Sequence, residues 1–73
     1  MNIAQIEQRL AQLATLKTAA EKRNNDILDL CLAENRATTD DEATAIAAAR
    51  DEVRRLNAEV SALNVTLTDL RAA

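Results

Sequence analysis

The chain lacks the two residues that most often interrupt a helix, because its 73 residues include neither Gly nor Pro. Gly supplies the positive φ angles of many turns and Pro punctuates loops, so their joint absence favours helix. Any connection must then be built from residues such as Asn, Asp and Thr. These observations argue against a strand-rich fold, and we expect one small all-α domain.

Two helices of nearly equal length are predicted, joined by one short turn. The first covers about residues 2–36, the turn about 36–39 and the second about 40–71. At 1.5 Å per residue, each helix is about 50 Å long. A turn of so few residues makes the helices antiparallel neighbours. The predicted fold is therefore a single antiparallel two-helix hairpin that resembles a coiled coil.

Both helices begin with the spacing of a capping box. Asn2 is followed three residues later by Gln5, and Thr39 is followed three residues later by Glu42. In this arrangement the side chain of each residue bonds to the backbone N–H of the other. The second box is the strongest local signal in the chain, and it predicts a helix that begins beside Thr39.

The charged residues around the turn suit the helix ends that they flank. Asp40, Asp41 and Glu42 place carboxylates at the positive end of the second helix, and Arg36 places a cation at the negative end of the first. The three acids also match the ligand type of hard divalent cations. Their position in a first helical turn already explains them, so we interpret them as helix-starting residues.

Apolar residues in both helices recur at heptad spacing, which is typical of a coiled-coil seam. With the turn near residues 36–39, the numbers of facing positions add up to about 75, which sets Ile27 near Ile46. The predicted hairpin seam comprises Ile6, Leu13, Ile27, Ile46, Val53, Leu56, Val60, Leu63, Leu67 and Leu70, with Ala20, Cys31 and Ala49 as smaller members.

Two polar residues, Lys17 and Asn24, interrupt the seam of the first helix. Polar residues at such positions can fix helix register or partner number at some cost in stability. Lys17 can instead extend its ammonium group from the seam edge into water. Asn24 and the adjacent Asn25 are weak helix formers, which indicates either a local bend or a polar contact between subunits.

Four leucines lie off this seam, at positions that a narrow two-helix contact would not use. Alanine makes up 16 of the 35 apolar residues and buries little surface. Ordering each residue costs about 1.5 kcal/mol, so a lone hairpin should be marginally stable. We expect a homo-oligomer in which further copies contact Leu16, Leu28, Leu30 and Leu32.

The composition argues against catalysis and against cofactor or metal binding. The chain has no His, one Cys and no Gly-rich phosphate loop. A net charge of −3 without aromatic residues is unsuited to nucleic acid. We find neither a membrane span nor a secretory signal in the sequence. These features predict a non-enzymatic cytoplasmic protein.

The segment Glu34–Asn64 resembles the N-terminal scaffolding (delta) region of tailed-bacteriophage major capsid proteins with the Hong Kong-type coat fold. In that family a helix ends in a polar turn with a basic residue, followed by a Thr cap, acidic residues and a second helix. The matching residues here are Arg36, Thr39, Asp41 and Glu42 in the turn, and Ile46, Glu52, Val53, Leu56 and Val60 in the second helix.

This resemblance implies an internal assembly chaperone. Such segments project inside the immature shell, self-associate beneath each capsomer and are typically removed by a maturation protease before DNA fills the head. The implied partners are the major capsid protein and that protease, and the implied location is the immature capsid in the host cell. The coat domain follows in the family, so the chain would be a fragment or a separately made scaffold.

A second hypothesis is a free-standing phage or bacterial coiled-coil adaptor or inhibitor. Such a protein would bind a protein partner through the surface of Leu28, Leu30 and Leu32. The gene sequence beyond Ala73 discriminates between the two hypotheses, because a strand-rich coat sequence favours the scaffold and a stop codon favours the adaptor.

Overall fold

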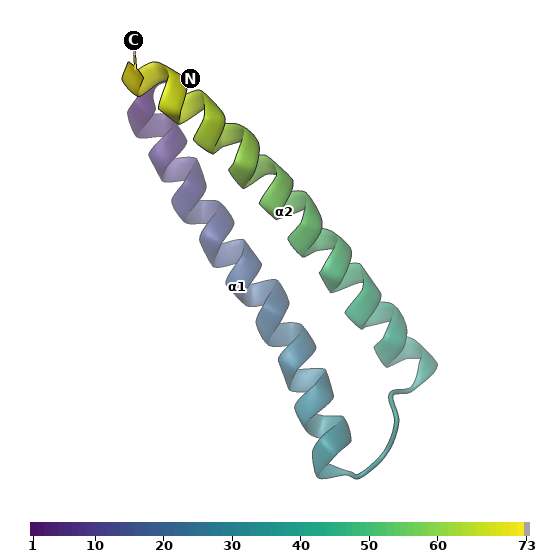
Figure 1. The fold of residues 1–73 in the computed structure, drawn as a ribbon. Coiled ribbons are helices and arrows are strands. Elements are labelled where there is room, and N and C mark those ends of the chain that lie inside the picture. Colours follow the sequence, from purple (N-terminus) through teal and green to yellow (C-terminus); the bar gives the residue numbers. More distant parts are fainter. Residues whose placement is uncertain (73) are drawn as a thin grey trace.

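The computed structural model describes residues 1–72 and contains two helices, α1 (Ile3–Ala33) and α2 (Asp40–Ala72). They pack side by side in opposite directions, with the start of α1 and the end of α2 at one end of the hairpin and the turn at the other (Figure 1). The hairpin is a rod with extents of 55 × 15 × 14 Å. The prediction of an all-α antiparallel hairpin is confirmed.

The start of α1 is a capping box, as predicted. The Asn2 side-chain oxygen accepts from the Gln5 backbone N–H at 2.8 Å, and the Gln5 side chain accepts from the Asn2 N–H at 2.9 Å. Two backbone donors that the helix cannot satisfy internally are thereby satisfied. The first helix is thus fixed within three residues of the N-terminus.

The end of α1 lies three residues earlier than predicted, at Ala33 rather than residue 36. Asn35 adopts a left-handed conformation with φ 53°, which no helix interior accommodates. The Asn35 N–H donates to the Leu32 carbonyl at 3.1 Å, and the Arg36 N–H donates to the Cys31 carbonyl at 3.0 Å. This pair of bonds is a Schellman motif, in which Asn replaces the usual Gly.

Substitution of Asn35 tests whether the left-handed residue sets the end of α1. Asn35→Ala should lower the free energy of unfolding by about 1 kcal/mol, because a Cβ without a compensating polar group disfavours this conformation. Asn35→Gly is the matched control and should be at least as stable as the wild type. Thermal melts followed by circular dichroism measure both, and equal melting of the two variants would contradict this account.

The core is a narrow strip between the two helices. Ile6 and Leu13 are completely buried. Among the predicted seam residues, Ile46 and Leu67 are also buried, whereas Ile27, Val53, Leu56, Val60 and Leu63 are half-buried. The other buried residues in the described chain are Ala20, Cys31 and Ala49. At most levels of the seam, the buried side chain is therefore either a small one or the only buried one at that level.

Leu70 is the one predicted seam residue that the structure leaves exposed, at 40%. It lies at the open end of the hairpin, in the last turn of α2 and level with the first turn of α1. No further turn of α1 extends beyond this level to cover the side chain. Assigning Leu70 to the buried seam was therefore wrong.

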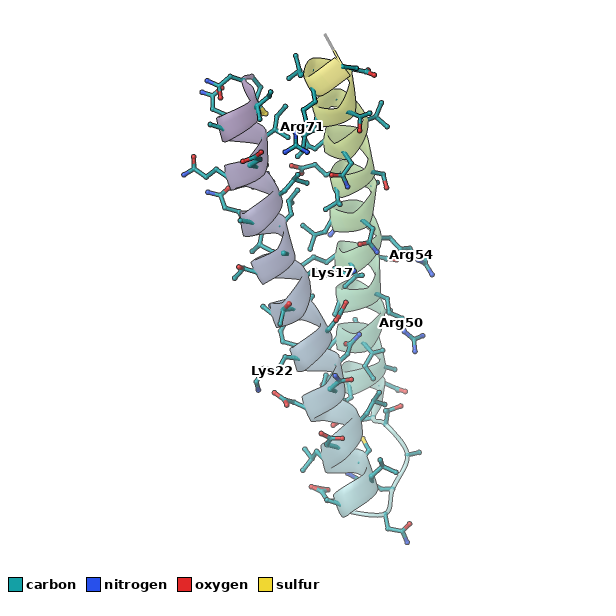
Figure 2. All side chains as sticks on the ribbon, turned by 60° about the vertical axis from the view of Figure 1, so that its left-hand side comes forward. Lys17, Lys22, Arg50, Arg54 and Arg71 are labelled. Atoms are coloured by element: carbon teal, nitrogen blue, oxygen red, sulfur yellow. The ribbon has the colours of Figure 1, made fainter. Side chains whose placement is uncertain are left out.

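Ion pairs between the helices flank the core. Arg9 donates to Glu59 at 2.6 Å, Arg23 to Glu52 at 2.6 Å and Arg71 to Glu7 at 2.7 Å. Figure 2 shows Arg71 between the helices, whereas Arg50 and Arg54 point from α2 away from α1. The Arg23–Glu52 pair agrees with the predicted register, in which facing numbers add up to about 75.

The two polar seam residues differ in how they are accommodated. Lys17 remains 41% exposed in its side chain, with its ammonium group 4.0 Å from the Glu21 carboxylate. Its position agrees with the interpretation that it extends from the seam edge. Asn24 is half-buried, and its buried side-chain oxygen has no hydrogen-bond partner. The seam therefore contains one unsatisfied acceptor near its middle.

Candidate functional site

Residues 1–72 offer no grouping of three or more Cys, Asp or Glu side chains that could hold a metal ion. No helix in the same range is long and apolar enough to cross a membrane. The candidate functional features are therefore a polar cluster at the turn, a set of exposed leucines and a groove between the helices.

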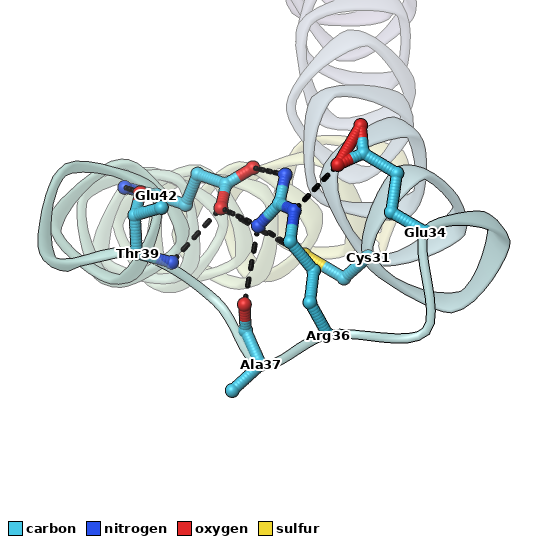
Figure 3. A network of polar contacts seen from close by, with 6 residues as sticks. All are labelled: Cys31, Glu34, Arg36, Ala37, Thr39 and Glu42. Atoms are coloured by element: carbon cyan, nitrogen blue, oxygen red, sulfur yellow. Dashed lines mark hydrogen bonds and ion pairs between the residues drawn. The ribbon is translucent and has the colours of Figure 1, made fainter.

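The polar cluster joins the end of α1 to the start of α2 through Arg36 (Figure 3). The Arg36 guanidinium donates two bonds to the Glu42 carboxylate, at 2.6 and 3.1 Å. It also donates to the Glu34 carboxylate at 2.7 Å and to the Ala37 carbonyl at 3.1 Å. A bidentate pair of this kind fixes the orientation of the guanidinium relative to the carboxylate. Arg36 thus links the end of α1 to the start of α2, and we call its bonds to Glu42 the Arg36–Glu42 clamp.

The predicted capping box of α2 shares its carboxylate with this clamp. The Glu42 N–H donates to the Thr39 hydroxyl at 3.1 Å, and the Thr39 N–H donates to the Glu42 carboxylate at 2.9 Å. Asp40 and Asp41 occupy the first turn of α2, as predicted. Glu42 therefore caps its own helix and binds Arg36 at the same time.

Titration of Glu42 should make the hairpin sensitive to acid. The Arg36 hydrogen bonds and the Thr39 backbone N–H lower the pKa of Glu42 from 4.5 to about 2. A pKa below the ordinary value means that ionised Glu42 stabilises the fold. That contribution is complete above about pH 5 and is lost as the pH falls through the folded-state pKa.

We expect the melting temperature of the wild type to fall between about pH 5 and pH 2, and Glu42→Gln to remove part of that dependence. The Glu42→Gln protein should also melt earlier than the wild type at neutral pH, because the clamp and the cap lose their anion. Asp41→Asn is the control, since that carboxylate lies in the same turn without bonding to Arg36. Parallel pH profiles of wild type and Glu42→Gln would refute the assignment.

The four predicted contact leucines are all exposed, by 42% at Leu16, 42% at Leu28, 47% at Leu30 and 79% at Leu32. Leu16 and Leu30 are fourteen residues apart, or four turns, so they project from one flank of α1. Leu28 and Leu32 are four residues apart and project from a different side. The exposed leucines thus form two surfaces rather than one.

An open groove of about 570 Å³ lies between the helices near the turn half of the hairpin. Three alanines of α2 and Ile27 of α1 give it an apolar surface, and charged residues surround it. The lining residues are Arg23, Asp26, Ile27, Ala45, Ala48, Ala49, Glu52 and Arg55. The groove exists because short alanine side chains face α1 at this level.

Sequence reasoning missed both the Arg36–Glu42 clamp and this groove. The signal for the clamp was a basic residue placed directly before a capping box that contains Glu. The signal for the groove was the alanine run Ala47–Ala49, where the heptad pattern has no large residue.

Comparison with known proteins provides no further assignment, because no protein-family model, no curated protein and no solved structure matches the chain.

Proposed function

We propose that this chain is a non-enzymatic scaffolding domain that self-associates to direct procapsid assembly of a tailed bacteriophage and is removed on maturation. The observation that supports self-association is the surface area that the hairpin exposes. The hairpin exposes 5236 Å², whereas a compact monomer of 7.9 kDa exposes about 4,400 Å². The excess of about 800 Å² is close to what each partner buries in an interface of standard size.

The exposed leucines support the same proposal. Large apolar patches on the surface of a soluble protein mark sites of interaction with another molecule. Leu16 and Leu30 lie outside the seam on the groove side, and within residues 1–72 only two large side chains, Ile6 and Leu13, are fully buried. Association of copies through this side would bury Leu16 and Leu30 and add the stability that a two-helix core lacks.

The assignment to a phage capsid rests on the sequence resemblance of Glu34–Asn64. Of the residues that carry it, Arg36 and Thr39 both bond to Glu42 in the turn. These bonds give the sequence pattern a structural reason, because a change at Glu42 would remove the partner of both other residues. The major capsid protein and a maturation protease are the partners that the proposal names.

Sedimentation velocity at micromolar concentration tests the self-association. We expect a mass that is a multiple of 7.9 kDa, and a stable monomer over that concentration range would overturn the proposal. Sequencing the gene downstream of Ala73 tests the capsid assignment, which requires a coat sequence in the same chain or in a neighbouring gene. Deletion of residues 1–73 should then abolish closed procapsids in expressing cells.

A second candidate function is an adaptor that binds another protein through Leu28 and Leu32. The observation that favours it is the 79% exposure of Leu32, four residues after the exposed Leu28. Such a spacing presents two anchors on one helical face. In this case the protein alone stays monomeric, and Leu28→Glu abolishes capture of the partner without changing sedimentation.

A further inference from the structure

The groove and two of the exposed leucines share one flank of the hairpin. Arg23, which lines the groove, lies seven residues after Leu16 and seven before Leu30. Residues seven apart project from the same side of a helix. This flank, which we call the groove flank, therefore presents an apolar hollow near Ile27 together with leucine side chains beyond it along α1.

The charged residues around the groove include both signs, so the rim is complementary to a second copy of the same rim. Arg23 and Arg55 are basic, whereas Asp26 and Glu52 are acidic, so the rim is neutral and carries both signs. Within residues 1–72, Arg23 pairs with Glu52, and Arg55 forms no ion pair. A surface of this kind fits a second copy of itself, in which each sign meets the other across a two-fold axis. The neutral rim provides no net electrostatic attraction for a strongly charged partner.

The area also fits one further copy. The rod exposes about 800 Å² more than a compact monomer of its mass, which equals one side of an interface of standard size. Covering one flank of a rod that is 55 Å long and 15 Å wide provides an area of this order. The occupant that the observations favour is therefore a second hairpin.

We propose that a second copy covers the groove flank in antiparallel orientation, so that Leu16 of each copy packs into the groove of the other. The proposal specifies the surface and register of the self-association proposed above and depends on it. Leu16 and Ile27 are eleven residues apart, which is about 16 Å along α1. A two-fold axis midway between them places each Leu16 opposite the groove of the second copy.

The same axis brings opposite charges together. Since Arg23 pairs with Glu52 across the hairpin, the level midway between Leu16 and Ile27 on α1 corresponds to the level between Glu52 and Arg55 on α2. The axis therefore sets Arg55 of each copy opposite Glu52 of the other. A parallel arrangement instead places groove against groove, which leaves both hollows unfilled.

The first experiment blocks the groove. Ala48→Glu introduces a carboxylate into the apolar lining, and Ala47→Glu is the matched control, because Ala47 is also exposed but does not line the groove. Both variants should keep the helicity of the wild type in circular dichroism. Sedimentation equilibrium should show dimerisation weakened at least about 30-fold by Ala48→Glu, since the change occurs twice in a two-fold interface.

A leucine pair provides the second contrast. Leu16→Glu should weaken dimerisation by a similar factor, whereas Leu28→Glu, at the same 42% exposure but on another side of α1, should leave it within about threefold of the wild type. Equal effects of the two substitutions, or an effect of Leu28→Glu alone, would assign the interface to another surface.

Disulfide cross-linking tests the register. In a Cys31→Ser background, Leu16→Cys protein is mixed with tagged Asp26→Cys protein, because Asp26 lines the groove one residue before Ile27. Oxidation should join the two proteins in a mixed dimer, and Leu28→Cys in place of Asp26→Cys should not. Absence of the first product would overturn the antiparallel register.

The outcomes separate this inference from the proposed function. If the wild type is monomeric, the self-association fails and the inference fails with it. If the wild type associates but Ala48→Glu and Ala47→Glu behave alike, self-association remains while the groove flank is excluded as its surface. If only the cross-link fails, the groove flank remains and the antiparallel arrangement is wrong.

Discussion

Replacing Leu13 with Ala is expected to leave the hairpin largely unfolded at 25 °C. Leu13 is completely buried, and truncation of a buried leucine to alanine costs about 2–5 kcal/mol through lost apolar contacts and the cavity left behind. A single core in a chain of this size rarely supplies more than about 3–5 kcal/mol. The loss is thus comparable with the whole stability of the fold.

Leu32→Ala is the matched control, because it removes the same atoms from a leucine that is 79% exposed in the same helix. It should change the free energy of unfolding by less than about 0.5 kcal/mol. Ile6→Val supplies a graded measurement and should cost about 0.5–1.5 kcal/mol at the other fully buried position. Urea titrations followed at 222 nm measure all three variants, and similar midpoints for Leu13→Ala and Leu32→Ala would mean that the seam is wrongly assigned.

The features that sequence predicts well are those encoded over a few residues. Both capping boxes follow from a pair of side chains three residues apart, and the structure contains both. The heptad spacing likewise predicts Ile6, Leu13, Ile46 and Leu67 as core, because the period of a helix decides which side of it faces a neighbour. These inferences need no knowledge of the rest of the chain.

The features that sequence missed depend on contacts across the turn or between the helices. The end of α1 is set by the left-handed Asn35, a conformation that Asn adopts only where surrounding bonds favour it. Arg36 was expected at the helix end for its charge alone, and its bond to Glu42 depends on the path of the turn between them. The groove depends on which alanines of α2 face α1, and therefore on register.

Replacing Asn24 with Leu is expected to stabilise the hairpin by about 1–2 kcal/mol. The Asn24 side-chain oxygen is buried without a partner, and an unsatisfied buried acceptor costs about 1–3 kcal/mol. Leucine removes that acceptor, restores an apolar residue to the heptad seam and has a higher helix propensity. The larger side chain has room, because the position is only half-buried.

Asn25→Leu is the control, because the adjacent residue is exposed and receives the same propensity gain without contacting the seam. It should stabilise by only a few tenths of a kcal/mol. Chemical denaturation of both variants at low protein concentration provides the comparison, and equal gains would show that the unpartnered acceptor costs nothing. Sedimentation of Asn24→Leu then tests the interpretation that this residue makes a polar contact between subunits. Unchanged association means that Asn24 only weakens its own hairpin, whereas weaker association of a more stable hairpin assigns its amide to a contact between copies.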